Sequence, residues 1–225
     1  MQAVVRSVLL VAAVAACGTP ATGVGPDASN GGSDGPGGFV SGLSVPFASK
    51  PTVPGTIKSD LTVTSMLFRM TSLRVIGDAG PGDTRTSKDN FQIAWSEGMK
   101  PATIVFADAP SGLYSKVALL ADGNLIDYSY EIYGNVKVND VTHPYKIHDR
   151  SPLGVAIDAN VTLDPGKSAV LGIRVELQPA FDTLDFSSLS NDNGTLELDT
   201  FDNQMSDFRS KMMSSGFVAT HDQTD

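Results

Sequence analysis

The chain has 225 residues, a formal net charge of −9 and a single cysteine, Cys17. The acidic balance excludes binding to nucleic acid or anionic lipid by charge. Because no cysteine follows Cys17, the rest of the chain excludes disulfides, Cys-ligated zinc and a thiol nucleophile. An apolar core must therefore stabilise the fold, and a chain of this length is long enough to build one.

Residues 1–16 have the layout of a bacterial secretory signal. One positive charge, Arg6, precedes nine apolar residues, Val8–Ala16, and small residues come directly before Cys17. Nine residues are too few to cross a bilayer, which takes about 20. We therefore expect residues 1–16 to be a signal peptide that is removed.

The ending Val14-Ala15-Ala16-Cys17 resembles the lipobox of bacterial lipoproteins. The resemblance implies cleavage between Ala16 and Cys17 and acylation of the Cys17 thiol, for example with palmitate. Stable anchoring takes more than one acyl chain, because each buried CH₂ contributes about 0.8 kcal/mol. Gly18 stands where Asp would favour the inner membrane, which implies the outer membrane, facing the periplasm or the cell surface. The alternative is a buried core cysteine.

Residues 17–38 are predicted to form a disordered linker after the lipidated Cys17. Eight Gly and three Pro occur among residues 18–38, and such a composition gives a flexible chain without a core. Gly31–Gly35 formally matches the G-x-S-x-G nucleophile elbow, but that motif needs a preceding strand and a following helix. No second Pro/Gly-rich boundary follows, so we expect one domain over residues 39–225.

Beyond the linker, apolar and polar residues alternate along several segments, as in strands that bury one face. The longest runs cover residues 153–163 and 169–177, and shorter ones cover 91–95, 113–121 and 136–147. Short strands at close spacing are typical of an antiparallel sandwich or barrel. We predict a mainly β fold, an antiparallel β-sandwich.

Turn residues separate these segments. Asn139-Asp140 suits a short hairpin, and Asp164-Pro165-Gly166-Lys167 suits a type II turn, in which Gly accepts a positive φ. Pro110-Ser111-Gly112 precedes the strand expected at 113–121. From Leu61 to Ile76 the alternation slips twice, which predicts β-bulges or a strand that crosses between sheets.

One short C-terminal helix is predicted from a different spacing. Its apolar stripe, at i, i+4, i+7 and i+11, consists of Phe201, Met205, Phe208 and Met212. Asp202 or Thr200 can cap its start, and Gly216 suits a left-handed residue after its end. We expect the helix to cover one open end of the sandwich; the alternative is that the stripe binds a partner or cofactor.

Three segments resemble a family of uncharacterised bacterial lipoprotein domains. They are Ala109–Gly123, with its Pro-x-Gly-x-Tyr turn, the hairpin Tyr133–Ile147, and the opening strand Leu61–Gly80. The resemblance extends over Leu61–Leu177. It implies an immunoglobulin- or transthyretin-like β-sandwich with no established activity, and it supplies no catalytic residues. The C-terminal helix departs from the family's simplest pattern.

The three histidines do not suggest a metal site. His143 and His148 are five residues apart on an expected strand, so they point to opposite faces. His221 lies in a polar tail. Because a metal needs several converging ligands, we expect each histidine to be exposed or satisfied by hydrogen bonds.

Calcium is the one cofactor that the residues leave open. Four acidic residues cluster in sequence near a Gly turn: Asp182, Asp185, Asp192 and Asp199. Hard cations favour such carboxylate sets. However, the loop Leu189–Thr200 has Leu and Thr where an EF-hand needs Asp and Glu, so we interpret it as a loop with a Gly turn. We expect solvated acids and no cofactor, with a looser calcium site as the alternative.

The sequence therefore predicts a lipid-anchored protein of the cell envelope. We expect a non-enzymatic binding or structural module whose partner is an envelope protein or a glycan. The alternatives are a small surface hydrolase, whose paired carboxylates meet only in the fold, and a calcium-dependent carbohydrate-binding domain.

Overall fold

The computed structural model describes residues 42–77, 84–123 and 126–220. The predicted signal peptide, the linker, the 38/39 domain boundary, Cys17 and His221 lie outside these ranges. The prediction of a mainly β sandwich with a short helix near the C-terminus is confirmed. No helix among the described residues is long and apolar enough to cross a membrane.

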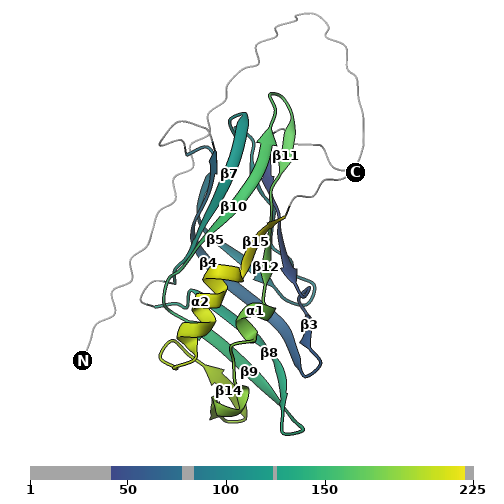
Figure 1. The fold of residues 1–225 in the computed structure, drawn as a ribbon, viewed down its shortest axis with the longest axis vertical. Coiled ribbons are helices and arrows are strands. Elements are labelled where there is room, and N and C mark those ends of the chain that lie inside the picture. The colour runs from purple at the N-terminus through teal and green to yellow at the C-terminus, as the bar shows by residue number, and fades with distance from the viewer. Residues whose placement is uncertain (1–41, 78–83, 124–125, 221–225) are drawn as a thin grey trace, which may run out of the picture. The chain divides into compact units, whose positions relative to one another are not determined.

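A nine-stranded sheet forms the larger layer. Its strands are β3 (Gly55–Lys58), β4 (Leu61–Gly77), β5 (Ser87–Trp95), β7 (Gly112–Ala121), β8 (Tyr130–Val138), β9 (Val141–Asp149), β10 (Leu153–Leu163), β13 (Ser190–Asp192) and β14 (Thr195–Leu198). Figure 1 shows β7 and β10 in the upper part of the view, and β8, β9 and β14 in the lower part.

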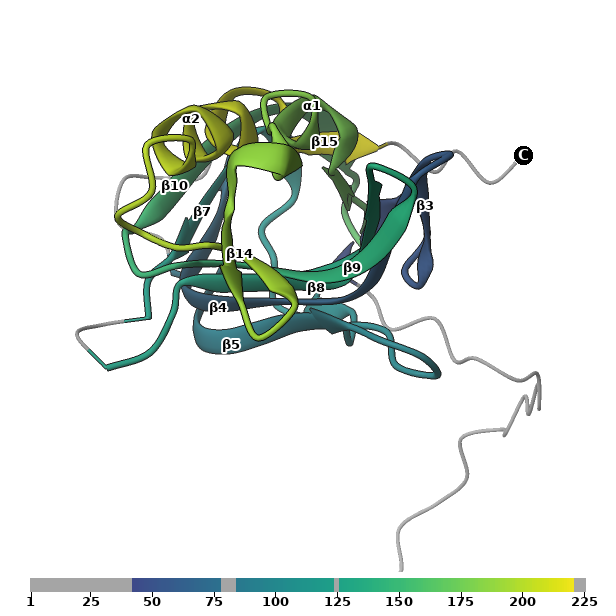
Figure 2. The same cartoon turned by 90° about the horizontal axis from the view of Figure 1, so that it is seen from below.

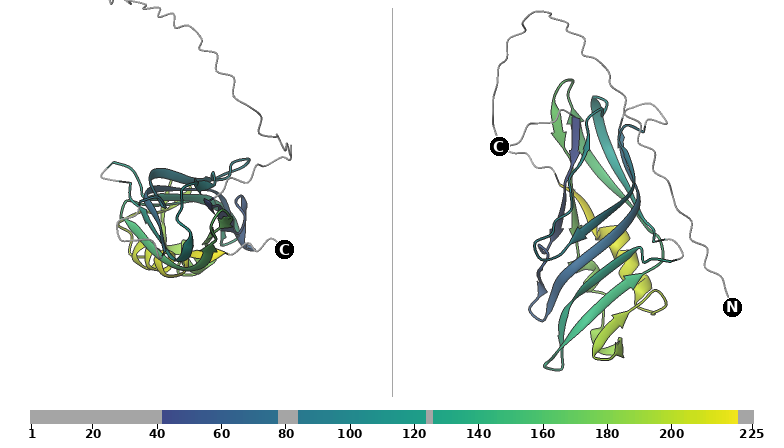
Figure 3. Two further views of the ribbon diagram at one scale, coloured as in Figure 1. Left: turned by 90° about the horizontal axis from the view of Figure 1, so that it is seen from above. Right: turned by 180° about the vertical axis from the view of Figure 1, so that it is seen from behind.

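The long strand β4 runs through both halves of this sheet (Figure 3). Met66 pairs with β5 and β8, and Met70 pairs with β5 and β7, so β7 and β8 lie along the same edge of β4. Along that edge, β8 pairs with Leu61–Phe68 and β7 with Met70–Gly77. The sheet therefore divides at Arg69 into an upper wing (β7 and β10) and a lower wing (β8, β9, β14 and β13).

Two three-stranded sheets and the helices form the second layer. One sheet has the order β11 (Ser168–Val170), β1 (Gly42–Val45), β6 (Ile104–Phe106), and the other β15 (Phe217–Thr220), β12 (Gly172–Glu176), β2 (Phe47–Lys50). The helices are α1 (Gln178–Phe181), the 3₁₀ helix η1 (Phe186–Ser188) and α2 (Met205–Ser215). Figure 2 shows α1, α2 and β15 on one side and β4, β5, β8 and β9 on the other.

Helix α2 packs on the core as part of the second layer, and it is shorter than the stripe indicated. Met205, Phe208 and Met212 are fully buried, and the Phe208 ring lies 5.5 Å from that of Phe181 and 6.3 Å from that of Tyr130. Phe201 precedes the helix and is 89% exposed. Its assignment to the stripe was wrong, because the chain between residues 199 and 204 forms turns before the helix begins.

Both predicted ends of α2 also differ. The N-cap residue is Gln204, whose side chain makes no capping hydrogen bond, although the Asp202 carboxylate accepts a hydrogen bond from its backbone N–H. Gly216 has φ −80°, so it is not left-handed. Glycine is needed there for another reason: a Cβ would lie 2.6 Å from the carbonyl oxygen of Met212.

The turn and bulge predictions are confirmed. Asn139 and Asp140 have φ values of 49° and 66°, as a two-residue hairpin turn between β8 and β9 requires. Gly166 has φ 70°, and the Lys167 N–H donates to the carbonyl of Asp164. The two slips of alternation coincide with shifts of pairing register in β4, between Val63 and Ser65 and between Met70 and Ser72.

Three features of the strands were predicted wrongly. The run at 169–177 divides at Leu171 into β11 and β12, which belong to different sheets. The loop expected at Leu189–Thr200 contains the hairpin β13–β14. The sheets are not wholly antiparallel, because β1 pairs with β11, β2 with β12 and β9 with β14 in parallel. The immunoglobulin- or transthyretin-like type stays a prediction.

Candidate functional site

The large sheet divides at a junction, and two connections cross this junction in addition to strand β4. The β7–β8 and β9–β10 connections both lead from one wing to the other. Buried Ser129 ties them together: its N–H donates to the carbonyl of Asp149 (2.7 Å), and its hydroxyl donates to that of Arg150 (3.1 Å). Arg69 of β4 lies between the segments that pair with β8 and β7: its N–H donates to the Ser129 carbonyl, and its carbonyl accepts from the Asp122 N–H. Main-chain hydrogen bonds and the Ser129 hydroxyl therefore hold the junction.

On the inner side of the junction, a buried ion pair joins the sheet to α2. The Asp149 carboxylate, which has no exposed surface, accepts from the Arg209 guanidinium at 2.5 and 3.0 Å and from the Tyr130 hydroxyl at 3.1 Å. Burial, together with the charge of Asp149, raises the pKa of Tyr130 well above its ordinary value. Asp149 also accepts from the Ser151 N–H (2.9 Å), and the cluster as a whole joins β8 and β9 to α2.

The outer side carries a row of polar groups, because alternate residues of β8 and β9 point outward. Arg69 donates to the Glu131 carboxylate (2.8 Å) and to the Tyr128 carbonyl (2.9 Å), and the Tyr133 hydroxyl donates to Glu131 (2.8 Å). Burial alone would raise the pKa of Glu131, but the hydrogen bonds from Tyr133 and Arg69 lower it overall. Burial and the bond to Glu131 raise the pKa of Tyr133 to about 12.

His148 lies beside this row, opposite Glu131 in the β8–β9 register. Its Nε2 is 3.2 Å from the Glu197 carboxylate of β14, and its ring stacks on that of Tyr128, with 4.2 Å between centroids and an interplanar angle of 11°. The Lys146 ammonium lies 5.3 Å and the Arg150 guanidinium 4.7 Å from the centre of the Tyr128 ring. Strands β9 and β14 and the β7–β8 connection thus supply one compact site.

A pocket of about 250 Å³ opens at this site. We call it the Tyr128 pocket, and its lining consists of Tyr128, His148, Arg150, Asp199, Thr200 and Phe201. The Thr200 hydroxyl accepts a hydrogen bond from the Arg150 N–H (2.8 Å), which joins the segment before α2 to the junction. The pocket therefore has two aromatic rings, one cation and one carboxylate at its wall.

One lining residue, His148, has an unsatisfied ring nitrogen, Nδ1. The residue is 4% exposed, and Nδ1 is buried without a hydrogen-bond partner in the described structure. Burial and the charge of Lys146 lower the pKa of His148, against the opposing effect of Glu197. The neutral ring needs its proton on Nε2, because Glu197 only accepts hydrogen bonds. Nδ1 is then a bare acceptor, and a buried polar group without a partner is costly.

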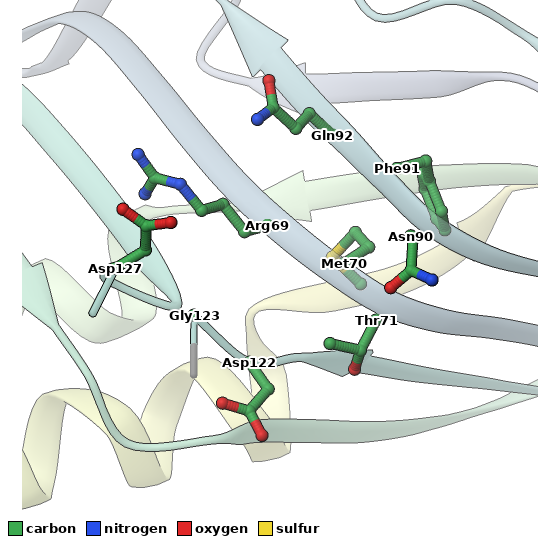
Figure 4. A pocket seen from close by; sticks show the side chains of 9 residues that line it. All are labelled: Arg69, Met70, Thr71, Asn90, Phe91, Gln92, Asp122, Gly123 and Asp127. Carbon is green, nitrogen blue, oxygen red and sulfur yellow. The ribbon is translucent and has the colours of Figure 1, made fainter. Parts of the chain in front are cut away.

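A second depression, of about 470 Å³, lies on the other side of Arg69. Figure 4 shows its side chains, which come from β4, β5 and the β7–β8 connection. The Arg69 guanidinium, its main cation, is already bound to Glu131 and the Tyr128 carbonyl. The main cation of this depression is therefore already paired within the protein.

The four acidic residues considered for calcium have separate partners. Asp182 pairs with Lys58, Asp185 accepts from Ser187, and the Asp192 carboxylate accepts from the side chain of the next residue. Asp199 accepts from the Phe201 N–H and lines the Tyr128 pocket. In the described ranges, no group of three or more His, Cys, Asp or Glu side chains could hold a metal ion. The calcium site stays an untested alternative.

Sequence reasoning missed most of this site. His143 is half-buried on β9, and His148 lies on the opposite face, as predicted, but its Nδ1 is not satisfied. No sequence pattern points to Tyr128 or Arg150. The available signal was weak: β9 ends in His148-Asp149 and Arg150 follows, so neither face of the chain is apolar there.

Comparison of the chain with protein-family models, with curated proteins and with solved structures finds no match. The resemblance to uncharacterised lipoprotein domains therefore has no support beyond the motifs that suggested it.

Proposed function

We propose that the β domain is a non-enzymatic binding module of the cell envelope, and that its ligand occupies the Tyr128 pocket. The observation that supports this proposal is the buried, unpartnered Nδ1 of His148, a residue that lines the pocket. A folded protein rarely leaves such an acceptor unpaired. A ligand that donates a hydrogen bond to Nδ1 would satisfy it.

We also propose that the domain is tethered to the outer membrane. The lipobox-like Val14–Cys17 would place lipids on Cys17, and the Gly-rich residues 18–38 would tether the domain to the outer membrane. A tethered module with a preformed pocket can capture a partner, such as an envelope protein or glycan, within reach of its anchor.

One observation favours a second function, a small surface hydrolase. Glu197 holds the His148 ring as an orienting carboxylate holds a catalytic base. Nucleophilic catalysis would also need a hydroxyl or thiol on that base. No described residue makes a hydrogen bond to Nδ1, so this arrangement supports binding more strongly.

The test uses thermal unfolding of the full chain with and without an extract of the cell envelope. A ligand at 100 times its Kd stabilises the folded state by about 2.7 kcal/mol, which raises the Tm of a protein of this size by several degrees. We expect this rise for the wild type and for the control Val141→Ala, whose side chain is exposed outside the pocket. Phe201→Ala should reduce it.

Phe201 suits the test because its exposed ring lines the pocket without supporting the core. An extract that stabilises all three proteins equally, or none of them, would contradict binding at this pocket.

A further inference from the structure

We infer that the Tyr128 pocket binds a neutral sugar unit of a glycan, one hydroxyl of which donates a hydrogen bond to His148 Nδ1. This inference rests on the proposed function and names its class of ligand. Four features of the pocket carry it: the acceptor, the exposed ring, the balance of charges and the size.

The acceptor requires a donor on the ligand. Glu197 fixes the proton of the neutral imidazole on Nε2, so Nδ1 offers only a lone pair. A carboxylate or an unprotonated phosphate oxygen has no hydrogen to donate. A hydroxyl, an amide N–H or an ammonium group has one.

The exposed ring of Phe201 favours a ligand that has an apolar face. The side chain is 89% exposed at the wall of the pocket, and aromatic rings at such a place pack against the flat apolar part of a ligand. A pyranose has C–H bonds on one face and hydroxyls around its edge. It therefore presents an apolar face and donors within a single ring.

The charges argue against an ionic ligand. Arg150 and Asp199 line the pocket with opposite signs, and behind them the Lys146 ammonium lies 3.6 Å from the Glu197 carboxylate. An anion in the pocket would meet the Asp199 carboxylate, and a cation would meet the Arg150 guanidinium. A neutral ligand can instead hydrogen-bond to both kinds of group.

The volume of the pocket argues against a drug-sized molecule, and the lack of enough metal-ligating side chains argues against a metal ion. The volume of about 250 Å³ is below the roughly 300–1,000 Å³ of pockets for drug-sized ligands, so it suits one ring of a longer chain. A metal ion bound to Nδ1 would need further ligands, and the described residues offer no group of three or more suitable side chains.

The experiment is a calorimetric titration of the full chain with short neutral oligomers of glucose, galactose, mannose and N-acetylglucosamine. Two matched probes are the same oligomers with methylated hydroxyls, which cannot donate, and oligomers of the corresponding uronic acids. We expect at least one neutral oligomer to bind, its methylated form to bind at least tenfold more weakly, and the uronic acids not to bind better.

Variants test the role of Nδ1. His148→Gln keeps a donor toward Glu197 but lacks an acceptor at Nδ1, and it should weaken binding about tenfold, as expected for the loss of one hydrogen bond. His148→Asn can place its amide oxygen near the Nδ1 position and should weaken binding less. Phe201→Ala should also weaken binding, and it provides the test if the His148 variants do not fold.

The outcomes separate this inference from the proposed function. If no neutral oligomer binds, or if methylated oligomers bind equally well, the inferred ligand class is wrong. Should the envelope extract still stabilise the wild type more than Phe201→Ala, the pocket remains a binding site for another ligand. If the extract has no such effect either, the proposed function fails as well.

Discussion

The imidazole of His148 lies parallel to the phenol ring of Tyr128, with 4.2 Å between the ring centroids. Residue 148 belongs to the end of β9, and residue 128 belongs to the connection between β7 and β8. The stack therefore joins the lower wing to the junction where the large sheet divides. It also fixes the plane of the imidazole of His148, which lines the pocket.

The lowered pKa of His148 predicts a pH dependence of stability. Burial and Lys146 hold this pKa below the ordinary value of 6.5, so in acid the unfolded chain takes up a proton before the folded protein does. The contribution to stability is complete above about pH 6.5 and is lost as the pH falls through the lowered pKa. Urea unfolding between about pH 7 and 5 should show this loss for the wild type.

His148→Gln is the control for this prediction, since Gln does not titrate. The difference in unfolding free energy between wild type and variant should change with pH only below about 6.5. Parallel curves over that range would show that the imidazole protonates equally well in the folded and unfolded states.

The buried pair Asp149–Arg209 predicts a large loss of stability on truncation. Arg209→Ala leaves a carboxylate with no exposed surface without its cation, at a cost of about 3–5 kcal/mol. Arg174→Ala breaks the more exposed pair with Glu176 and should cost about 1 kcal/mol or less. Chemical denaturation measures both. Equal losses would mean that the buried pair does not hold α2.

Replacement by Ala should change the stability of the protein by very different amounts at two phenylalanines, Phe208 and Phe201. Phe208→Ala opens a cavity in the core and should cost about 3–5 kcal/mol, whereas Phe201→Ala, at an exposed position, should change stability by less than about 0.5 kcal/mol. Thermal unfolding distinguishes them. A Phe208→Ala protein that melts like the wild type would remove Phe208 from the core.

The lipoprotein hypothesis predicts that substitution of Cys17, which lies outside the described residues, releases the protein from the membrane. Cys17→Ala removes the thiol that would be acylated, so the protein should lose metabolic labelling with palmitate and pass from the membrane fraction to the soluble one. Ser7→Ala, within the signal peptide, is a control that should stay anchored. A Cys17→Ala protein that still enters a detergent phase would contradict the lipoprotein hypothesis.

Local patterns predicted the elements that depend on local interactions. The alternation along residues 153–163 indicated β10, and Asn139-Asp140 indicated the β8–β9 turn, because strand faces and turn backbones are set by neighbouring residues. The short strands β1 and β2 escaped prediction, since each pairs in parallel with residues 168–176, more than a hundred positions along the chain. Four residues carry too little periodicity to reveal such a partner.

The sequence did not predict the Tyr128 pocket either, because its residues are also distant from one another in the chain. His148 is buried because Glu197 comes from β14 and Tyr128 from the β7–β8 connection, and no local spacing links the three residues. Prediction of opposite faces for His143 and His148 required only the period of a strand. Prediction of an unpaired Nδ1 required the fold.

The most direct test of the binding proposal is the NMR signal of the His148 ring nitrogens in the full chain at neutral pH. Without ligand, we expect a protonated Nε2 and a bare Nδ1. An envelope extract that stabilises the protein should shift the Nδ1 signal as a hydrogen bond forms, and Val141→Ala should show the same shift. A protonated Nδ1 in the free protein, or an Nδ1 signal that stays unchanged when the extract stabilises the protein, would contradict it.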